Sequence, residues 1–210
     1  MLSPNSQQAL EILRDPSTLS WYVVPMIAIV LYAIYFEIDR NNWRRVFAAF
    51  AFVGMDLFNE LWNGLVMFLS DFAPVWGVTG PSAFRILVGW NIEIVFAFML
   101  TGIMATMALP ADKHAKIWGL NNRVFFIIFN SMLCVGFEML IHQAGIIVWE
   151  WPWWNASNPW LIFLVGYVPF FTVCYWVYDM DCTKKQGKTV ASIYGFNGLA
   201  IIGLASMGWI

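Results

Sequence analysis

The sequence has few charged residues. Aspartate, glutamate, lysine and arginine make up 11% of its 210 residues, whereas 60% of the residues are hydrophobic. Because soluble globular domains have about 25% charged residues, this composition excludes an ordinary soluble protein. The formal net charge of −2 leaves no basic surface for nucleic acid, so we expect no nucleic-acid partner. The composition therefore predicts an integral membrane protein.

Cysteine, histidine and intramembrane lysine are also scarce. The three cysteines have no CxxC spacing, which argues against a disulfide framework and a zinc knuckle. A haem with two axial histidines would need both His114 and His142, and no lysine within an apolar segment could hold retinal as a Schiff base. We predict no cofactor. A bound metal stays open, because carboxylate and imidazole groups are ligands for iron, manganese and zinc.

The first residues lack the basic start and the apolar run of a cleaved signal peptide. We expect residues 1–18 to form a short amphipathic segment, in which Ser3 caps a helix that has Pro4 in its first turn. Apolar side chains such as Leu10 would then touch the membrane surface. Residues 19–210 are predicted to form a single transmembrane domain.

Long apolar runs dominate the rest of the chain. About 20 apolar residues cross a bilayer as a helix, and a helix satisfies its own backbone hydrogen bonds in lipid. The sequence therefore predicts an all-α, polytopic membrane bundle of about six transmembrane helices. The six segments are residues 20–37, 46–69, 83–109, 123–148, 158–178 and 190–210.

The basic residues predict the orientation of this bundle. Lysine and arginine are retained in short cytoplasmic loops, and nine of the eleven fall in alternate loops. Only Arg14 and Arg85 fall on the other side, so we expect both termini on the non-cytoplasmic side. The nine are Arg40, Arg44, Arg45, Lys113, Lys116, Arg123, Lys184, Lys185 and Lys188.

Ionisable side chains lie inside several of these segments, where they are costly and usually functional. Asp56, Glu60 and Asn63 follow one another at intervals of four and three residues, and Glu138 and His142 are four apart. Residues at these spacings share one face of a helix. Each polar face would have to point into the bundle or into a water-filled cavity.

Three acidic residues are expected at one depth in the membrane. A helix rises about 1.5 Å per residue, which places Glu60, Glu93 and Glu138 at a similar height, between the middle of the bilayer and its outer surface. Three segments would thus contribute carboxyl groups to one apolar pocket. The alternative is that some polar residues, such as Asn59 and Asn91, only join helices by hydrogen bonds.

Such a pocket suits acid–base chemistry on an alkene. A carboxyl group in apolar surroundings keeps its proton more readily than in water, so one acid can donate a proton while a neighbouring carboxylate accepts one. We expect Glu60 and Glu138 to be this pair, Glu93 to be the second carboxylate and His142 to relay protons. The predicted substrate contacts are Asp56, Asn59, Trp62, Asn63, Trp90, Asn91 and Trp176.

The sequence resembles the emopamil-binding protein family, the sterol double-bond isomerases of the EXPERA type, from about residue 50 to 180. The resemblance lies in "FNELWNGLVMF", "FRILVGWNIEIVFAF" and "NPWLIFLVGYVPFFTVCYWVYDM". It implies that Glu93 corresponds to an acid of that family. Asn59 and Asn63 stand where the family has a histidine and a glutamate.

The sequence is also similar to the small integral-membrane terpene cyclases. Glu60, between Asn59 and Trp62, matches the glutamate of their second span, and "VCYWVYD" looks like their last span. Both resemblances imply proton-driven chemistry on a hydrophobic unsaturated lipid.

The sequence thus predicts a multi-pass membrane enzyme that isomerises or cyclises a terpenoid or sterol-like lipid. Membrane lipids are the expected surroundings, and a homo-oligomer is compatible with the sequence. Two alternatives stay open: a proton-coupled carrier of small molecules or ions, and a metal-dependent membrane oxidoreductase with carboxylate and histidine ligands.

Overall fold

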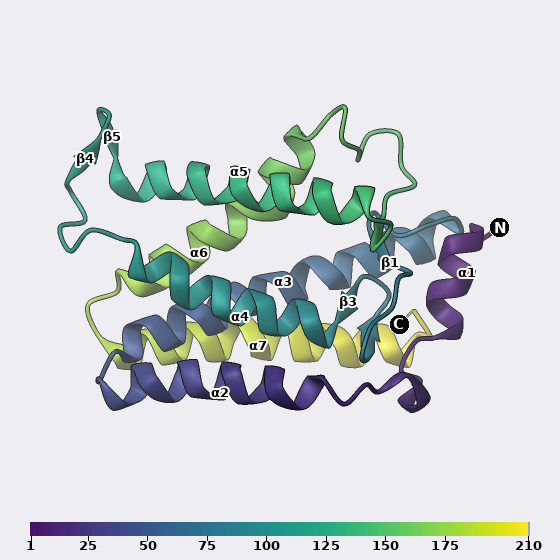
Figure 1. The fold of residues 1–210 in the computed structure, drawn as a ribbon, viewed down its shortest axis with the longest axis horizontal. Coiled ribbons are helices and arrows are strands. Elements are labelled where there is room, and N and C mark those ends of the chain that lie inside the picture. The colour runs from purple at the N-terminus through teal and green to yellow at the C-terminus, as the bar shows by residue number, and fades with distance from the viewer. Residues whose placement is uncertain (210) are drawn as a thin grey trace.

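The computed structural model describes residues 1–209 and is mostly helical. Six long helical stretches run alternately up and down, and the two chain ends lie at the same end of the bundle (Figure 1). We call this the terminal end, and the opposite end, where the arginine- and lysine-rich loops lie, the basic end. The stretches are α2 (Val23–Asp39), α3 (Trp43–Ser70), α4 (Ile92–Met107), α5 (Asn122–Gln143), the π-helical segment Ile162–Tyr167 continued by α6 (Val168–Tyr178), and α7 (Thr183–Ser206).

Each apolar run of the sequence therefore contains one helix. Among the described residues, α5 and α7 have both the length and the hydropathy to cross a membrane, while α4 and the stretch Ile162–Tyr178 are apolar but shorter. The last residue of the predicted sixth segment, Ile210, lies outside the described residues.

The predicted start of the third segment is wrong. Residues 83–91 do not continue the helix, because they form a hairpin of β2 (Arg85–Leu87) and β3 (Trp90–Asn91). The helix begins only at Ile92, where the Asn91 side chain accepts a hydrogen bond from the Ile94 amide at 2.8 Å. Such a side-chain cap satisfies an amide that has no partner within the helix. Glu93 consequently lies in the first turn of α4.

Two other predicted boundaries also shift. The apolar pattern extends the fourth segment to residue 148, but α5 ends at Gln143, and Gly145 follows with a φ of 73° that favours glycine. The pattern starts the sixth segment at residue 190, but α7 begins at Thr183. Its lysines thus lie on the first turns of the helix.

Short antiparallel strand pairs connect the helices. β1 (Gly77–Val78) pairs with β6 (Ile147–Val148), so the loop after α3 is tied to the loop after α5 at the terminal end. β4 (Lys116–Ile117) pairs with β5 (Leu120–Asn121) at the basic end (Figure 1).

Helix α3 occupies the centre of the bundle and packs against α4, α6 and α7. Small side chains allow close approach: a Cβ atom at Gly102 of α4 would lie 2.7 Å from the Cα of Ala49. Phe52 of α3 is fully buried and makes edge-to-face contacts with aromatic rings of α4 and α6. This packing fixes the position of the polar residues further along α3.

Helix α5 lies to one side and packs mainly against α6 and the π-helical segment (Figure 1). Its basic end is held by Arg123, which forms two hydrogen bonds of 2.8 Å to the Asp179 carboxylate after α6. Its outer face carries exposed apolar residues, including Leu133 and Leu140. Such a face is suited to contact with lipid.

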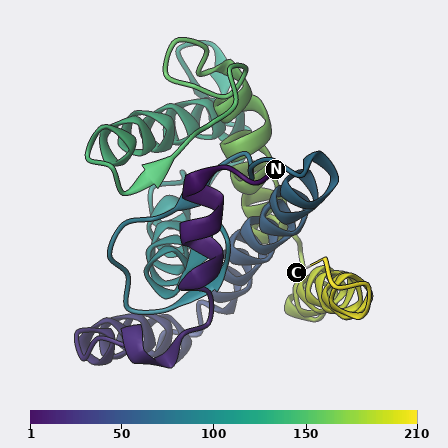
Figure 2. The same ribbon diagram turned by 90° about the vertical axis from the view of Figure 1, so that its right-hand side faces the viewer.

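The N-terminal helix α1 (Pro4–Glu11) lies across the terminal end of the bundle (Figure 2). As predicted, Ser3 caps it, since its hydroxyl accepts a hydrogen bond from the Ser6 amide at 3.1 Å. The Ser3 hydroxyl also donates to Glu150 at 2.6 Å, and the Ser3 amide donates to the Phe72 carbonyl at 2.9 Å. These bonds tie α1 to the loops that follow α3 and β6.

Candidate functional site

A cavity of about 250 Å³ lies among α3, α4, α5 and the π-helical segment, towards the terminal end. We call it the carboxylate cavity. Most of its wall is apolar, with Phe98 and Phe170 among the lining residues. Six polar residues proposed from the sequence also line it, namely Asp56, Asn59, Glu60, Asn91, Glu93 and Glu138.

Glu60 is 2% exposed and lies at the centre of a hydrogen-bond network. The Trp76 indole N–H donates to one carboxylate oxygen, and the Asn63 amide donates to the other at 3.3 Å. Asn63 also accepts hydrogen bonds from the amides of Val75, at 2.7 Å, and Trp76. Asn63 thus fixes the loop after α3 onto the helix and brings Trp76 to Glu60.

Glu138 reaches the cavity from α5. It accepts a hydrogen bond from the Tyr167 hydroxyl at 2.5 Å and one from the Trp149 indole at 3.2 Å. Tyr167 is the last residue of the π-helical segment, a geometry that often occurs at functional sites. The Asn59 amide donates to the Val165 carbonyl of this segment at 3.2 Å, which links α3 to it.

Asp56 lies one helical turn before Glu60 and accepts a hydrogen bond from the Trp90 indole. Among residues 1–209, Asp56, Glu60 and Glu138 form no ion pair with a lysine, arginine or histidine. Their hydrogen-bond donors are all neutral. Because ionised carboxylates without a cation are costly in apolar surroundings, the three groups form a cluster that can hold protons.

Glu93 lines the cavity from the first turn of α4, and its carboxylate is well supplied with donors. The Tyr22 hydroxyl donates at 2.6 Å, the Ser82 hydroxyl at 2.9 Å and the Ala83 amide at 2.6 Å. These contacts join α4 to the start of α2 and to the preceding loop. Glu93 therefore has an evident structural role beside any chemical one.

His142 does not reach the cavity and forms no hydrogen bond with Glu138. Its ring stacks on Trp149 with a centroid distance of 4.0 Å and an interplanar angle of 14°. Its Nδ1 lies 2.9 Å from the Ile147 carbonyl oxygen. Although Glu138 and His142 share a helix face, Trp149 takes the place beside Glu138 that the sequence suggested for the histidine.

The predicted tryptophan contacts differ in position. Trp62 donates a hydrogen bond to Asn59 at 3.0 Å and packs edge-to-face on Trp76, so it supports the cavity from behind. Trp90 positions Asp56 in a similar way. Trp176 is 57% exposed and lies near the basic end beside Asp179, so it is not part of this site.

Sequence reasoning missed the side chains that hold the carboxylates: Trp76, Trp149 and Tyr167. Trp149 belongs to a tryptophan-rich stretch typical of the membrane interface, yet the residue is buried and its indole N–H donates to Glu138. A buried tryptophan normally finds an acceptor for its N–H. The repeated pairing of an acid with an indole appears only once the loops are folded over the bundle.

The carboxylate cavity is not fully enclosed, and exposed residues of α4 and α5 line part of it. Ala97 lines it from α4 and Phe137 from α5, and Phe137 is also 65% exposed. An apolar molecule could therefore enter from the side of the bundle. Within residues 1–209, no three histidine, cysteine, aspartate or glutamate side chains are arranged to hold a metal ion.

The chain belongs to a family described as an uncharacterized membrane protein family, whose model matches residues 3–206. It is similar to a protein of Archaeoglobus fulgidus, described as an uncharacterized protein, with 47% identity over 206 residues and 98% of both chains covered. A second protein of that organism, with the same description, is 50% identical over 54 residues, 25% of this chain and 95% of its own. No solved structure matches. None of these descriptions refers to sterol isomerases or terpene cyclases.

Proposed function

We propose that the protein crosses the membrane six times and uses its carboxylate cavity for acid–base chemistry on an apolar, unsaturated lipid of terpenoid or sterol-like type. The observation that carries this proposal is a cluster of three carboxyl groups, Asp56, Glu60 and Glu138, with neutral donors in a mainly apolar cavity.

The arrangement of the helices supports six crossings. The helical stretches alternate in direction, and both termini lie at the end opposite the arginine- and lysine-rich loops. Positive residues are retained on the cytoplasmic side of a membrane. The basic end is then cytoplasmic, and the carboxylate cavity lies in the outer half of the bilayer.

The proposed reaction needs one proton donor and one acceptor. A carboxylic acid transfers its proton to one carbon of a double bond, which forms a C–H bond and leaves a carbocation on the neighbouring carbon. A carboxylate then removes a proton from an adjacent carbon, and the double bond re-forms one position along. Glu60 of α3 and Glu138 of α5 line the cavity from different helices, and we assign the two roles to this pair.

Other residues would support the reaction. A proton must return from the acceptor to the donor between turnovers, and Asp56, one turn from Glu60, is placed to take part. The aromatic rings of Phe98 and Phe170 would stabilise the carbocation through their faces. The opening beside Phe137 would admit a substrate dissolved in the membrane.

Incorporation of solvent deuterium into a panel of candidate lipids tests this proposal. The purified protein in lipid nanodiscs is incubated in D₂O with polyprenols, geranylgeraniol and unsaturated sterols, and the lipids are analysed by mass spectrometry. A protonation–deprotonation cycle places deuterium on carbon. We expect carbon-bound deuterium with at least one member of the panel for the wild type, and none for Glu138→Gln or Glu60→Gln.

Glu11→Gln is the matched control, because Glu11 is exposed on α1 and does not line the carboxylate cavity. It should retain the wild-type incorporation. Full incorporation by folded Glu138→Gln protein, or no incorporation by the wild type with the whole panel, would contradict the proposal.

A further inference from the structure

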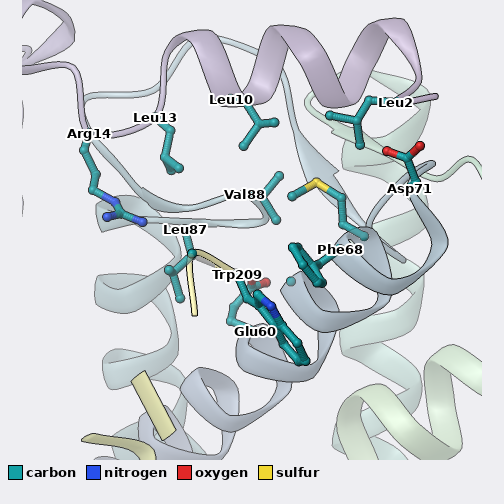
Figure 3. A pocket seen from close by; sticks show the side chains of 13 residues that line it. Leu2, Leu10, Leu13, Arg14, Glu60, Phe68, Asp71, Leu87, Val88 and Trp209 are labelled. Atoms are coloured by element: carbon teal, nitrogen blue, oxygen red, sulfur yellow. The ribbon is translucent and has the colours of Figure 1, made fainter. Parts of the chain in front are cut away.

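A second cavity, of about 280 Å³, lies beneath helix α1 at the terminal end. We call it the α1 cavity. Figure 3 shows Leu10 of α1 and Leu13 of the turn that follows it on one side, and Phe68 and Trp209 on the other. Trp209, near the C-terminus, stacks on Phe68 with a centroid distance of 4.6 Å. The two chain ends and the last turns of α3 thus enclose a mainly apolar space.

The charged groups at this cavity are not equivalent. Asp71 already has a partner, because the N-terminal ammonium group of Met1 lies 2.9 Å from its carboxylate. Arg14 donates from Nε to the Ile86 carbonyl at 3.3 Å. Its two terminal guanidinium nitrogens have no hydrogen-bond partner within residues 1–209, and Arg14 forms no ion pair there. The exposed guanidinium of Arg14 is thus a positive charge without an ion-pair partner at the edge of the α1 cavity.

The backbone holds Arg14 in an uncommon conformation. Its φ is 57°, a value that few residues other than glycine adopt. Its amide donates a hydrogen bond of 3.1 Å to the Arg85 carbonyl, which fixes this turn against the loop before α4. In Figure 3 the guanidinium lies at one end of the cavity and Asp71 at the other.

We propose that the α1 cavity binds a single-chain amphiphile with an anionic headgroup. The headgroup, a carboxylate or a phosphate, pairs with the guanidinium of Arg14, whose planar donors match both groups. The chain lies along Leu10, Leu13 and Phe68. At the opposite end the ammonium group of Met1 is already paired with Asp71, so the unpaired guanidinium of Arg14 sets the direction in which the ligand lies.

Glu60 connects the α1 cavity with the carboxylate cavity. Its side chain lines both the α1 cavity and the carboxylate cavity. A chain in the α1 cavity would therefore lie against Glu60, whose side chain also lines the carboxylate cavity. The binding proposal does not depend on the proposed reaction, because it concerns Arg14 and the apolar wall alone.

Photo-crosslinking tests the proposal. The purified protein in nanodiscs of zwitterionic lipid is exposed to palmityl chains that carry a diazirine and end in a carboxylate, a phosphate monoester, an alcohol or a trimethylammonium group. Labelled peptides are then mapped by mass spectrometry. We expect the two anionic probes to label the peptides that contain Leu10 and Met67 roughly tenfold more than the alcohol and the ammonium probe. This factor corresponds to one charge-assisted hydrogen-bonded pair with Arg14, which the alcohol and the ammonium probe cannot form. Comparison of carboxylate with phosphate distinguishes a fatty acid from a lipid phosphate.

Matched variants identify the source of the selectivity. Arg14→Gln should reduce anionic labelling to the level of the alcohol, while Arg14→Lys should retain most of it. Arg40→Gln, a change of an exposed arginine at the basic end, should leave it unchanged. Leu10→Trp should reduce labelling by every probe, because the larger side chain fills the cavity without changing the charge.

Equal labelling by the anionic and cationic probes would overturn the proposal, as would anion selectivity that survives in Arg14→Gln. If Arg14→Gln does not fold, the wild-type probe series and Leu10→Trp still decide the outcome. Glu138→Gln should show normal labelling, so failure of the proposed chemistry and failure of this binding site give different results.

Discussion

Replacement of Gly89 by alanine should disturb the carboxylate cluster without removal of any of its members. A Cβ atom at this position would lie 2.6 Å from Cδ1 of Trp76, 2.7 Å from Nδ2 of Asn63 and 2.8 Å from Oε1 of Glu60. Contacts under 3.0 Å force a neighbour to move. The Trp76 ring has little room to do so, because Trp62 and Trp154 pack against it with centroid distances of 5.2 and 5.5 Å.

The expected cost has two parts. Overpacking of a close-packed site destabilises by about 1–3 kcal/mol, and loss of the Trp76 hydrogen bond would leave the buried Glu60 carboxyl group less satisfied, at about 1–3 kcal/mol more. A loss of about 2–6 kcal/mol in the free energy of unfolding lowers the melting temperature of a chain of this length by roughly 4–24 °C. Deuterium incorporation should fall as well, because Glu60 is displaced.

Thermal unfolding in detergent, followed by tryptophan fluorescence, measures this effect. Gly77→Ala is the matched control from the same loop, since its Cβ would meet only Pro74, at 3.6 Å, and it should melt close to the wild type. If Gly89→Ala has the same melting temperature as Gly77→Ala and keeps full activity, the proposed rigidity of the Glu60 network is refuted.

Three further predictions follow from other contacts. His142→Phe should retain most of the deuterium incorporation, because the ring can still stack on Trp149 and Glu138 keeps both donors; a loss as complete as that of Glu138→Gln would instead assign His142 a direct chemical role. Gly102→Ala should destabilise the protein by about 1–3 kcal/mol in denaturant unfolding, since its Cβ meets the Cα of Ala49 at 2.7 Å, whereas Gly195→Ala, with open space around it, should not. A membrane-impermeant maleimide applied to whole cells should label the double variant Ser17→Cys, Cys182→Ser. In the wild type it should not label the exposed Cys182 until the cells are permeabilised. The reverse pattern would show that the termini lie on the cytoplasmic side.

The helices were predictable from the sequence because lipid-facing and buried helix surfaces both demand long apolar runs. The runs locate every long helix, and the serine cap of α1 follows from a local signal. The hairpin of residues 83–91 was missed because its side chains are as apolar as those of a helix. Hydropathy alone does not separate the two structures.

The site was predictable only in part. Spacing and depth bring Asp56, Glu60 and Glu138 to one cavity, because these are properties of single helices and of a common bilayer. The partners of the acids come from loops far along the chain, such as Trp149 for Glu138 and Trp90 for Asp56. No local pattern encodes those contacts. The position of His142 was mispredicted for the same reason, because a shared helix face does not reveal what packs between two side chains. Its chemical role stays a prediction.

The attachments of α5 determine how the entrance to the carboxylate cavity can change. One end of the helix is fastened by the pairing of β1 with β6, and the other by the two hydrogen bonds of Arg123 to Asp179. A helix held at both ends cannot pivot outward about one of them; it can only bend at its middle or rotate about its own axis. Phe137 and Glu138 are consecutive residues of α5, so any rotation of the helix that moves Phe137 away from the entrance also reorients the Glu138 carboxyl group.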